Sequence, residues 1–78
     1  MTKLESIKHL TSDFNKVGNL LVKYDKHRLL RIEIEFDKDE NIRGIQIISL
    51  IDRTTKKFDY FSRLSILNAI KTFNLNNR

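Results

Sequence analysis

The chain has 78 residues, no cysteine and no proline, and a formal net charge of +5 at pH 7. This length predicts one domain, residues 1–78, near the small end of what a single hydrophobic core stabilises. Without cysteine, disulfides and thiolate metal sites are excluded, and self-association as a homodimer is a common remaining aid to stability.

The N-terminal residues lack the apolar core of a signal peptide, and the densest apolar stretch, residues 45–51, is interrupted by Gln46 and Ser49. It is far shorter than a membrane span. We therefore expect a cytoplasmic protein with no membrane partner. The abundance of Ile, Lys and Asn, which have AT-rich codons, suggests a bacterial, phage or other mobile-element source.

In the first segment, apolar residues recur at helical spacing from Ile7 to Tyr24. This spacing predicts a helix over 3–17 that continues toward Tyr24. An alternative stays open, because Gly18 and Asn19 are suited to ending a shorter helix. In that case residues 20–24 form an extra strand.

Residues 30–37 alternate apolar and charged side chains without interruption, which predicts a strand with one buried face. The polar segment 38–41 is rich in turn formers and predicts a hairpin to a second strand that starts at Ile42. A four-residue loop pairs Asp37 with Ile42. The same register sets Ile34 opposite Ile45, whereas a shift by one residue would set isoleucines against glutamates.

Residues 52–56 predict a second turn, and residues 57–61 a third strand with Phe58 and Tyr60 on the inner face. Ser62 is a suitable N-cap for a final helix, and Phe61 and Ile66 occupy the positions of a hydrophobic staple. Helical spacing then relates the apolar residues Leu64, Ile66, Leu67, Ile70 and Phe73.

The predicted fold is α+β: a three-stranded antiparallel β-meander with an N-terminal and a C-terminal helix on one face. The order α-β-β-β-α resembles that of double-stranded-RNA-binding domains. However, the last helix opens with residues 62–65, Ser-Arg-Leu-Ser, rather than with that family's lysine cluster. No binding residues are carried over from the family.

Positive charge is concentrated in the two outer parts of the chain. Residues 1–31 carry seven Lys/Arg against three Asp/Glu, residues 32–42 carry one against five, and residues 43–78 carry seven against two. Basic residues around the second turn, third strand and last helix are candidates for nucleic-acid phosphates. They are Arg53, Lys56, Lys57, Arg63 and Lys71.

The predicted register leaves apolar side chains at one end of the outer sheet face. The candidate interface residues are Leu29, Ile48, Leu50 and Phe61. Such a group is seldom left in water on a soluble monomer. Three occupants are open: a helix end or segment 25–28 of the same chain, a second copy, or another protein.

Signals of catalysis are weak. His9 has Asp13 rather than a second histidine one helical turn on, and His27 lies between cations in a predicted loop. Glu33 and Glu35 share a face at about 7 Å by strand geometry, but that face is open and we expect it to be solvated. We predict no catalytic residues, metal or cofactor, and hence no enzyme.

These observations favour a small non-catalytic regulator that contacts nucleic acid through basic residues. The alternative is an inhibitor or modulator of another protein, docking through the apolar patch or a sheet edge. The sequence does not separate these two hypotheses.

Overall fold

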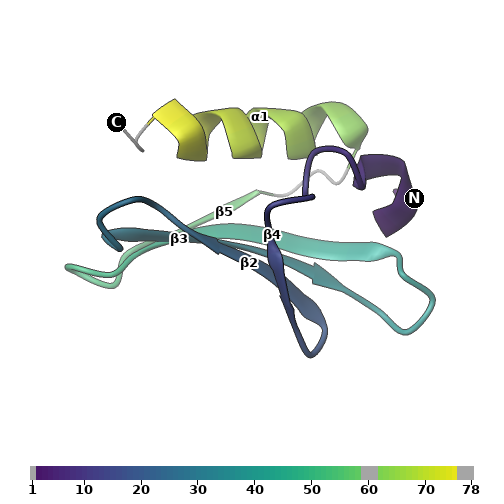
Figure 1. Ribbon diagram of the computed structural model, residues 1–78, viewed down its shortest axis with the longest axis horizontal. Coiled ribbons are helices and arrows are strands. Elements are labelled where there is room, and N and C mark those ends of the chain that lie inside the picture. Colours follow the sequence, from purple (N-terminus) through teal and green to yellow (C-terminus); the bar gives the residue numbers. More distant parts are fainter. Residues whose placement is uncertain (1, 59–61, 76–78) are drawn as a thin grey trace.

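The computed structural model describes residues 2–58 and 62–75, which fold as an antiparallel sheet with one α-helix against it (Figure 1). The sheet has five strands in the order β1-β2-β3-β4-β5, each antiparallel to its neighbour. The elements are η1 (Leu4–Ile7), β1 (Asn15–Val17), β2 (Leu20–Tyr24), β3 (Leu30–Phe36), β4 (Ile42–Ser49), β5 (Thr55–Phe58) and α1 (Arg63–Leu75). The α+β class, the antiparallel meander and the C-terminal helix are confirmed, but the predicted count of three strands is wrong, because β1 and β2 extend the sheet to five.

The predicted N-terminal helix over 3–17 is wrong. The region forms the single 3-10 turn η1 and, at its end, strand β1. The alternative strand over residues 20–24 is confirmed as β2. Gly18 has φ +60 and lies with Asn19 in the turn of a β1–β2 hairpin, not at a helix end. Gly-Asn between two apolar segments is a hairpin signal, and pairing with β3 replaces the helical hydrogen bonds.

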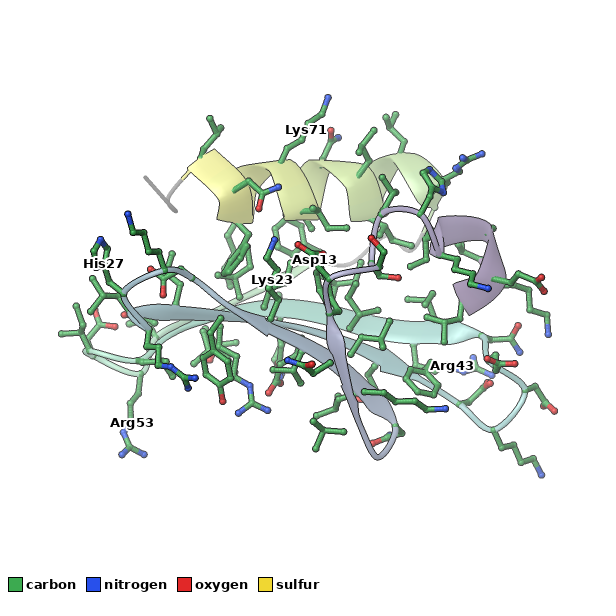
Figure 2. The ribbon with its side chains drawn as sticks, viewed as in Figure 1. Asp13, Lys23, His27, Arg43, Arg53 and Lys71 are labelled. Carbon is green, nitrogen blue, oxygen red and sulfur yellow. The ribbon has the colours of Figure 1, made fainter. Side chains whose placement is uncertain are left out.

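The apolar spacing of the first segment has another explanation. Ile7, Phe14 and Leu21 are all in the core, but they reach it from η1, a loop and β2 in turn. Val17, which the helical pattern would bury, is 57% exposed. An ion pair of 2.6 Å between Asp13 and Lys23 joins the loop to β2 (Figure 2).

The predicted β3–β4 register is confirmed for most of its length. Ile34 pairs with Ile45, and the pairing continues without a shift to Arg31 and Ile48. The expected pair of Asp37 with Ile42 is wrong, because the register shifts between Glu35 and Phe36 and sets Phe36 opposite Ile42. This bulge turns both of those apolar side chains into the core, where each is buried.

The last part of the chain follows its prediction with shifted boundaries. Strand β5 begins at Thr55, inside the predicted turn, and Phe58 packs against the core as expected. Ser62 Oγ accepts the Ser65 N–H at 3.2 Å, which confirms the N-cap. Tyr60 and Phe61, with the proposed staple, lie outside the described residues.

Helix α1 and η1 lie on the same side of the sheet (Figure 1). The helix buries Ile66, Ala69, Ile70 and Phe73, whereas Leu64 is 66% exposed and faces away. Among the described residues, no helix covers the opposite side, which we call the open face. Its side chains from β2 to β5 are Leu20, Val22, Tyr24, Arg31, Glu33, Glu35, Gln46, Ile48, Thr55 and Lys57.

No helix within 2–58 or 62–75 has the length and apolarity to span a bilayer.

Candidate nucleic-acid interface

Two connections of the meander meet at one end of the sheet. The β2–β3 connection, residues 25–29, and the β4–β5 connection, residues 50–54, adjoin each other, and the Leu50 N–H donates to the Leu29 carbonyl at 2.8 Å. We call these two connections the arginine end, because each holds an arginine in an unusual backbone conformation.

Asp25 builds the first of these connections. The residue is 6% exposed, and its Oδ1 accepts the N–H groups of Leu29 at 2.6 Å and Leu30 at 3.0 Å. The Arg28 N–H closes the turn by donating to the Asp25 carbonyl at 3.1 Å. Arg28 itself has φ 56, in the left-handed region that glycine and asparagine adopt most easily.

Asp52 builds the second connection in a related way. Its Oδ1 accepts the Thr54 N–H at 3.1 Å and the Thr54 hydroxyl at 2.8 Å. These hydrogen bonds from Thr54, with one from the Ser49 side chain, lower the pKa of Asp52, so it is ionised at neutral pH. Arg53 has φ 62, and its side chain extends from the sheet on the side away from α1 (Figure 2).

A row of open-face side chains adjoins the arginine end. Tyr24, Arg31, Ile48 and Thr55 stand opposite one another on β2, β3, β4 and β5. The guanidinium carbons of Arg28 and Arg31 lie 5.0 and 5.5 Å from the centre of the Tyr24 ring, within range for cation–π attraction. The row therefore presents an aromatic ring with two guanidinium groups over it.

Arg31 is held in place by neutral and charged partners. Its Nη1 donates to the Tyr24 hydroxyl at 3.0 Å, and its Nη2 lies 2.6 Å from Glu33 Oε2. The Gln46 amide donates to the other oxygen of Glu33. Glu33 is only 7% exposed, so the expectation that it is a solvated surface residue is wrong. It serves to orient Arg31.

Farther along the open face, the surface changes character. A hollow of about 260 Å³ opens over Gly44, which contributes no side chain opposite Glu35. Two acidic residues, Glu33 and Glu35, and two basic residues, Arg43 and Lys57, are among those that line it. Arg43 is paired with Asp37 at 2.8 Å. The two carboxylates make this part of the face less favourable for phosphate than the arginine end. Among the described residues, no ion pair engages Lys57, so it stays a candidate for phosphate although it lines the same hollow.

The five predicted basic residues do not form one cluster. Arg53 and Lys57 lie at the arginine end and on the open face, whereas Lys71 projects from the outer side of α1, on the opposite side of the molecule from Arg53 (Figure 2). The Arg63 guanidinium lies 3.4 Å from the His9 ring at the start of α1. Lys56 has its ammonium 5.4 Å from the Phe58 ring centre.

The predicted apolar patch is assembled in part. Leu29 and Leu50 are 44% and 40% exposed, Ile48 is half-buried beside them, and Ile51, which sequence reasoning omitted, is 74% exposed. Phe61 lies outside the described residues. These apolar side chains stand directly between Arg28 and Arg53 along the two connections.

Sequence reasoning missed Tyr24, Arg28 and Arg31 as candidates. The signal was present, because a β2–β3 hairpin with Asp25 as its turn former sets Tyr24 opposite Arg31. It was hidden by the helical interpretation of residues 18–24.

No protein-family model, curated protein or solved structure matches this chain. Within residues 2–58 and 62–75, no three His, Asp or Glu side chains come together as metal ligands.

Proposed function

We propose that the protein is a small regulator that binds nucleic acid through its arginine end, Tyr24, Arg31 and Lys57. The observation that carries this proposal is that Arg28 and Arg53 both occupy left-handed backbone positions, in adjoining turns, at the same end of the sheet. Glycine or asparagine would adopt the backbone conformation of both positions with less strain. Strained residues of this kind cluster at functional sites.

The charges of these arginines are available to a ligand. Asp25 and Asp52, the nearest acids in sequence, point their carboxylates at backbone N–H groups of their own turns. Among the described residues, no ion pair engages Arg28, Arg53 or Lys57. Guanidinium groups suit phosphate because they offer several fixed donors. Among the described residues, the charges of Arg28 and Arg53 are thus not neutralised by an acidic side chain.

The test is fluorescence anisotropy with labelled single-stranded and duplex oligonucleotides over a salt series. Three phosphate contacts predict a slope of log affinity against log salt of about −2 for single strands. The double variant Arg28→Gly/Arg53→Gly should bind at least about tenfold more weakly and with a shallower slope. Both glycines fit the left-handed positions, so folding is preserved.

The matched control removes two charges elsewhere. Lys8 and Lys71 are exposed, so Lys8→Ala/Lys71→Ala lowers the net charge equally without touching the arginine end. We expect this control to bind within about twofold of wild type at equal salt. The proposal is contradicted if both double variants lose affinity equally, or if about 10 μM protein shifts no oligonucleotide at about 50 mM salt.

A protein-binding inhibitor or modulator is the second candidate, and the exposure of Leu29, Leu50 and Ile51 favours it. Under this hypothesis the patch is covered by a second copy or by a target protein. Light scattering of wild type and Leu50→Arg distinguishes a second copy from a target protein as the occupant of the patch. A wild-type dimer that becomes monomeric in Leu50→Arg assigns the patch to self-association, whereas equal monomer masses exclude it.

A further inference from the structure

Resting on the proposed function, we infer that the ligand is single-stranded nucleic acid rather than a duplex. The juxtaposition behind this inference is that exposed apolar side chains lie beside Arg28 and Arg53 in the two connections at one end of the open face. Phosphate binding alone explains the arginines and leaves Leu29, Leu50 and Ile51 unexplained.

Bases are the part of a nucleic acid that covers apolar and planar protein groups. In a duplex they are stacked on one another, and the outer surface is phosphate and sugar. In a single strand each base has free faces that stack on aromatic rings and guanidinium planes. Leu29, Leu50 and Ile51 therefore gain contacts from a single strand that a duplex does not supply.

The row from Tyr24 to Thr55, beside these apolar residues, offers the planar groups on which bases stack. Arg28 lies over the Tyr24 ring at 5.0 Å, and Arg31 is fixed by the Tyr24 hydroxyl and Glu33. A guanidinium held on a ring gives a base a flat, charged surface on which to stack. Because Arg31 is already oriented, less side-chain freedom is lost when a ligand binds.

The shape of the molecule is unfavourable for reading a duplex. The row from Tyr24 to Thr55 crosses four strands, which at about 4.8 Å per strand spans about 14 Å. That is wider than the ≈ 12 Å major groove, which admits a helix or a two-stranded ribbon. The open face therefore cannot enter the groove.

The two narrower elements lack the charge for groove binding. The tip of the β1–β2 hairpin, residues 17–19, contains no charged residue, and the Lys16 ammonium lies 5.5 Å from the Phe36 ring centre. The outer side of α1 presents Leu64 and Leu75, which are 66% and 63% exposed, beside Lys71. Phosphates on both sides of a groove need more cations than these elements provide.

The carboxylates of Glu33 and Glu35 limit where a bound nucleic-acid strand can run. Glu33 and Glu35 line the hollow on the side of the row away from the arginine end. A bound strand therefore runs across the sheet from Tyr24 toward Thr55, with its phosphates on Arg28, Arg53 and Lys57. Its bases lie against Tyr24 and the leucines.

The experiment compares four ligands of one length by anisotropy at one salt concentration: oligo(dT), oligo(U), a DNA duplex and an abasic DNA strand. We expect oligo(dT) or oligo(U) to bind at least about tenfold more tightly than the duplex and the abasic strand. Leu50→Ser should weaken oligo binding about three- to tenfold and leave the abasic strand unchanged. Leu64→Ser, which removes an even more exposed leucine from α1, should change neither.

Circular dichroism melting of both leucine variants establishes that they are folded before binding is compared. A duplex or abasic strand that binds as tightly as the oligonucleotides overturns this inference and leaves the proposed function standing. If none of the four ligands binds, the proposed function fails as well. A loss in Leu64→Ser equal to that in Leu50→Ser removes the assignment of bases to the arginine end.

Discussion

The turns at residues 25–28 and 37–40 share one backbone design but lie at opposite ends of β3. Each begins with an aspartate whose Oδ1 accepts the N–H group four residues on, at 2.6 Å for Asp25 and 2.9 Å for Asp37. Each places a charged residue in the left-handed region at its fourth position, Arg28 with φ 56 and Glu40 with φ 62. The sequences, Asp-Lys-His-Arg and Asp-Lys-Asp-Glu, differ in charge.

This comparison separates what the fold needs from what a ligand could use. The aspartate is required by the backbone, because it satisfies N–H groups that the hairpins leave unpaired. The charge at the left-handed position is not required, since arginine and glutamate fit the same geometry. The choice of arginine at one end and glutamate at the other polarises the sheet along its strands.

The largest effect we expect is from Asp25→Ala. Asp25 is 6% exposed and serves two N–H groups, which this change leaves without their acceptor. Unsatisfied buried donors predict a loss of about 2–3 kcal/mol in the free energy of unfolding. Urea denaturation measures it, with Asp52→Ala as the exposed counterpart that should lose less. Equal losses would mean that burial does not set the cost of these turns.

Next in size is a charge exchange between the two turns, Arg28→Glu with Glu40→Arg. The formal net charge stays at +5, and both residues keep the left-handed positions they share with the wild type. We expect oligonucleotide affinity in the anisotropy assay to fall about tenfold, which is about 1.4 kcal/mol. Unchanged affinity would show that net charge alone drives binding and would remove the arginine end from the proposal.

These comparisons also show how far the sequence predicts the fold. The β3–β4 hairpin was predictable because alternation over residues 30–37 fixes which face is buried, and a one-residue slip would bury glutamates. The bulge at Phe36 was not, since the unshifted register sets Ile42 opposite Asp37, and burying both Phe36 and Ile42 requires a shift. Such a shift is settled by packing, which a two-residue period does not record.

The prediction of a helix in the N-terminal segment failed for a different reason. Core residues at 7, 14 and 21 fit a helical period by coincidence, although η1, a loop and β2 supply them separately. Tertiary pairing of β2 with β3 overrode that local pattern. The candidate site inherited the error, because Tyr24 and Arg31 meet only when residues 20–24 are a strand. Lys71 was grouped with Arg53 since linear sequence does not show that α1 and the β4–β5 turn point apart.

The contribution of the turn at residues 37–40 to stability should depend on pH. Hydrogen bonds from the Asn41 N–H, the Arg43 side chain, the Asp39 N–H and the Asn41 side chain lower the pKa of Asp37 from 3.8 to about 2. The ionised carboxylate therefore stabilises the fold fully above pH 3.8, and this contribution is lost as the pH falls toward 2.

Urea unfolding at several pH values between 2 and 7 measures the Asp37 effect. Asp37→Asn should be less stable than wild type at pH 7, and its stability should fall less between pH 4 and pH 2. Asp39→Asn is the control, because the Asp39 carboxylate accepts no hydrogen bond from the turn and should leave the profile nearly unchanged. A wild-type profile that is flat below pH 4 would contradict the role of Asp37.

The smallest effect comes from replacing the two left-handed residues by glycine, one at a time. Relief of the left-handed strain, offset by the greater freedom of glycine in the unfolded chain, predicts that Glu40→Gly gains about 0.5–1 kcal/mol in the free energy of unfolding. Arg28→Gly relieves the same strain but loses the guanidinium contact 5.0 Å from the centre of the Tyr24 ring, worth about 0.5 kcal/mol at an exposed site. We therefore expect Arg28→Gly to be the less stabilised of the two in parallel urea titrations. A larger gain for Arg28→Gly than for Glu40→Gly would mean that the Tyr24 contact contributes nothing and that the arginine is kept at this turn at a net cost to folding.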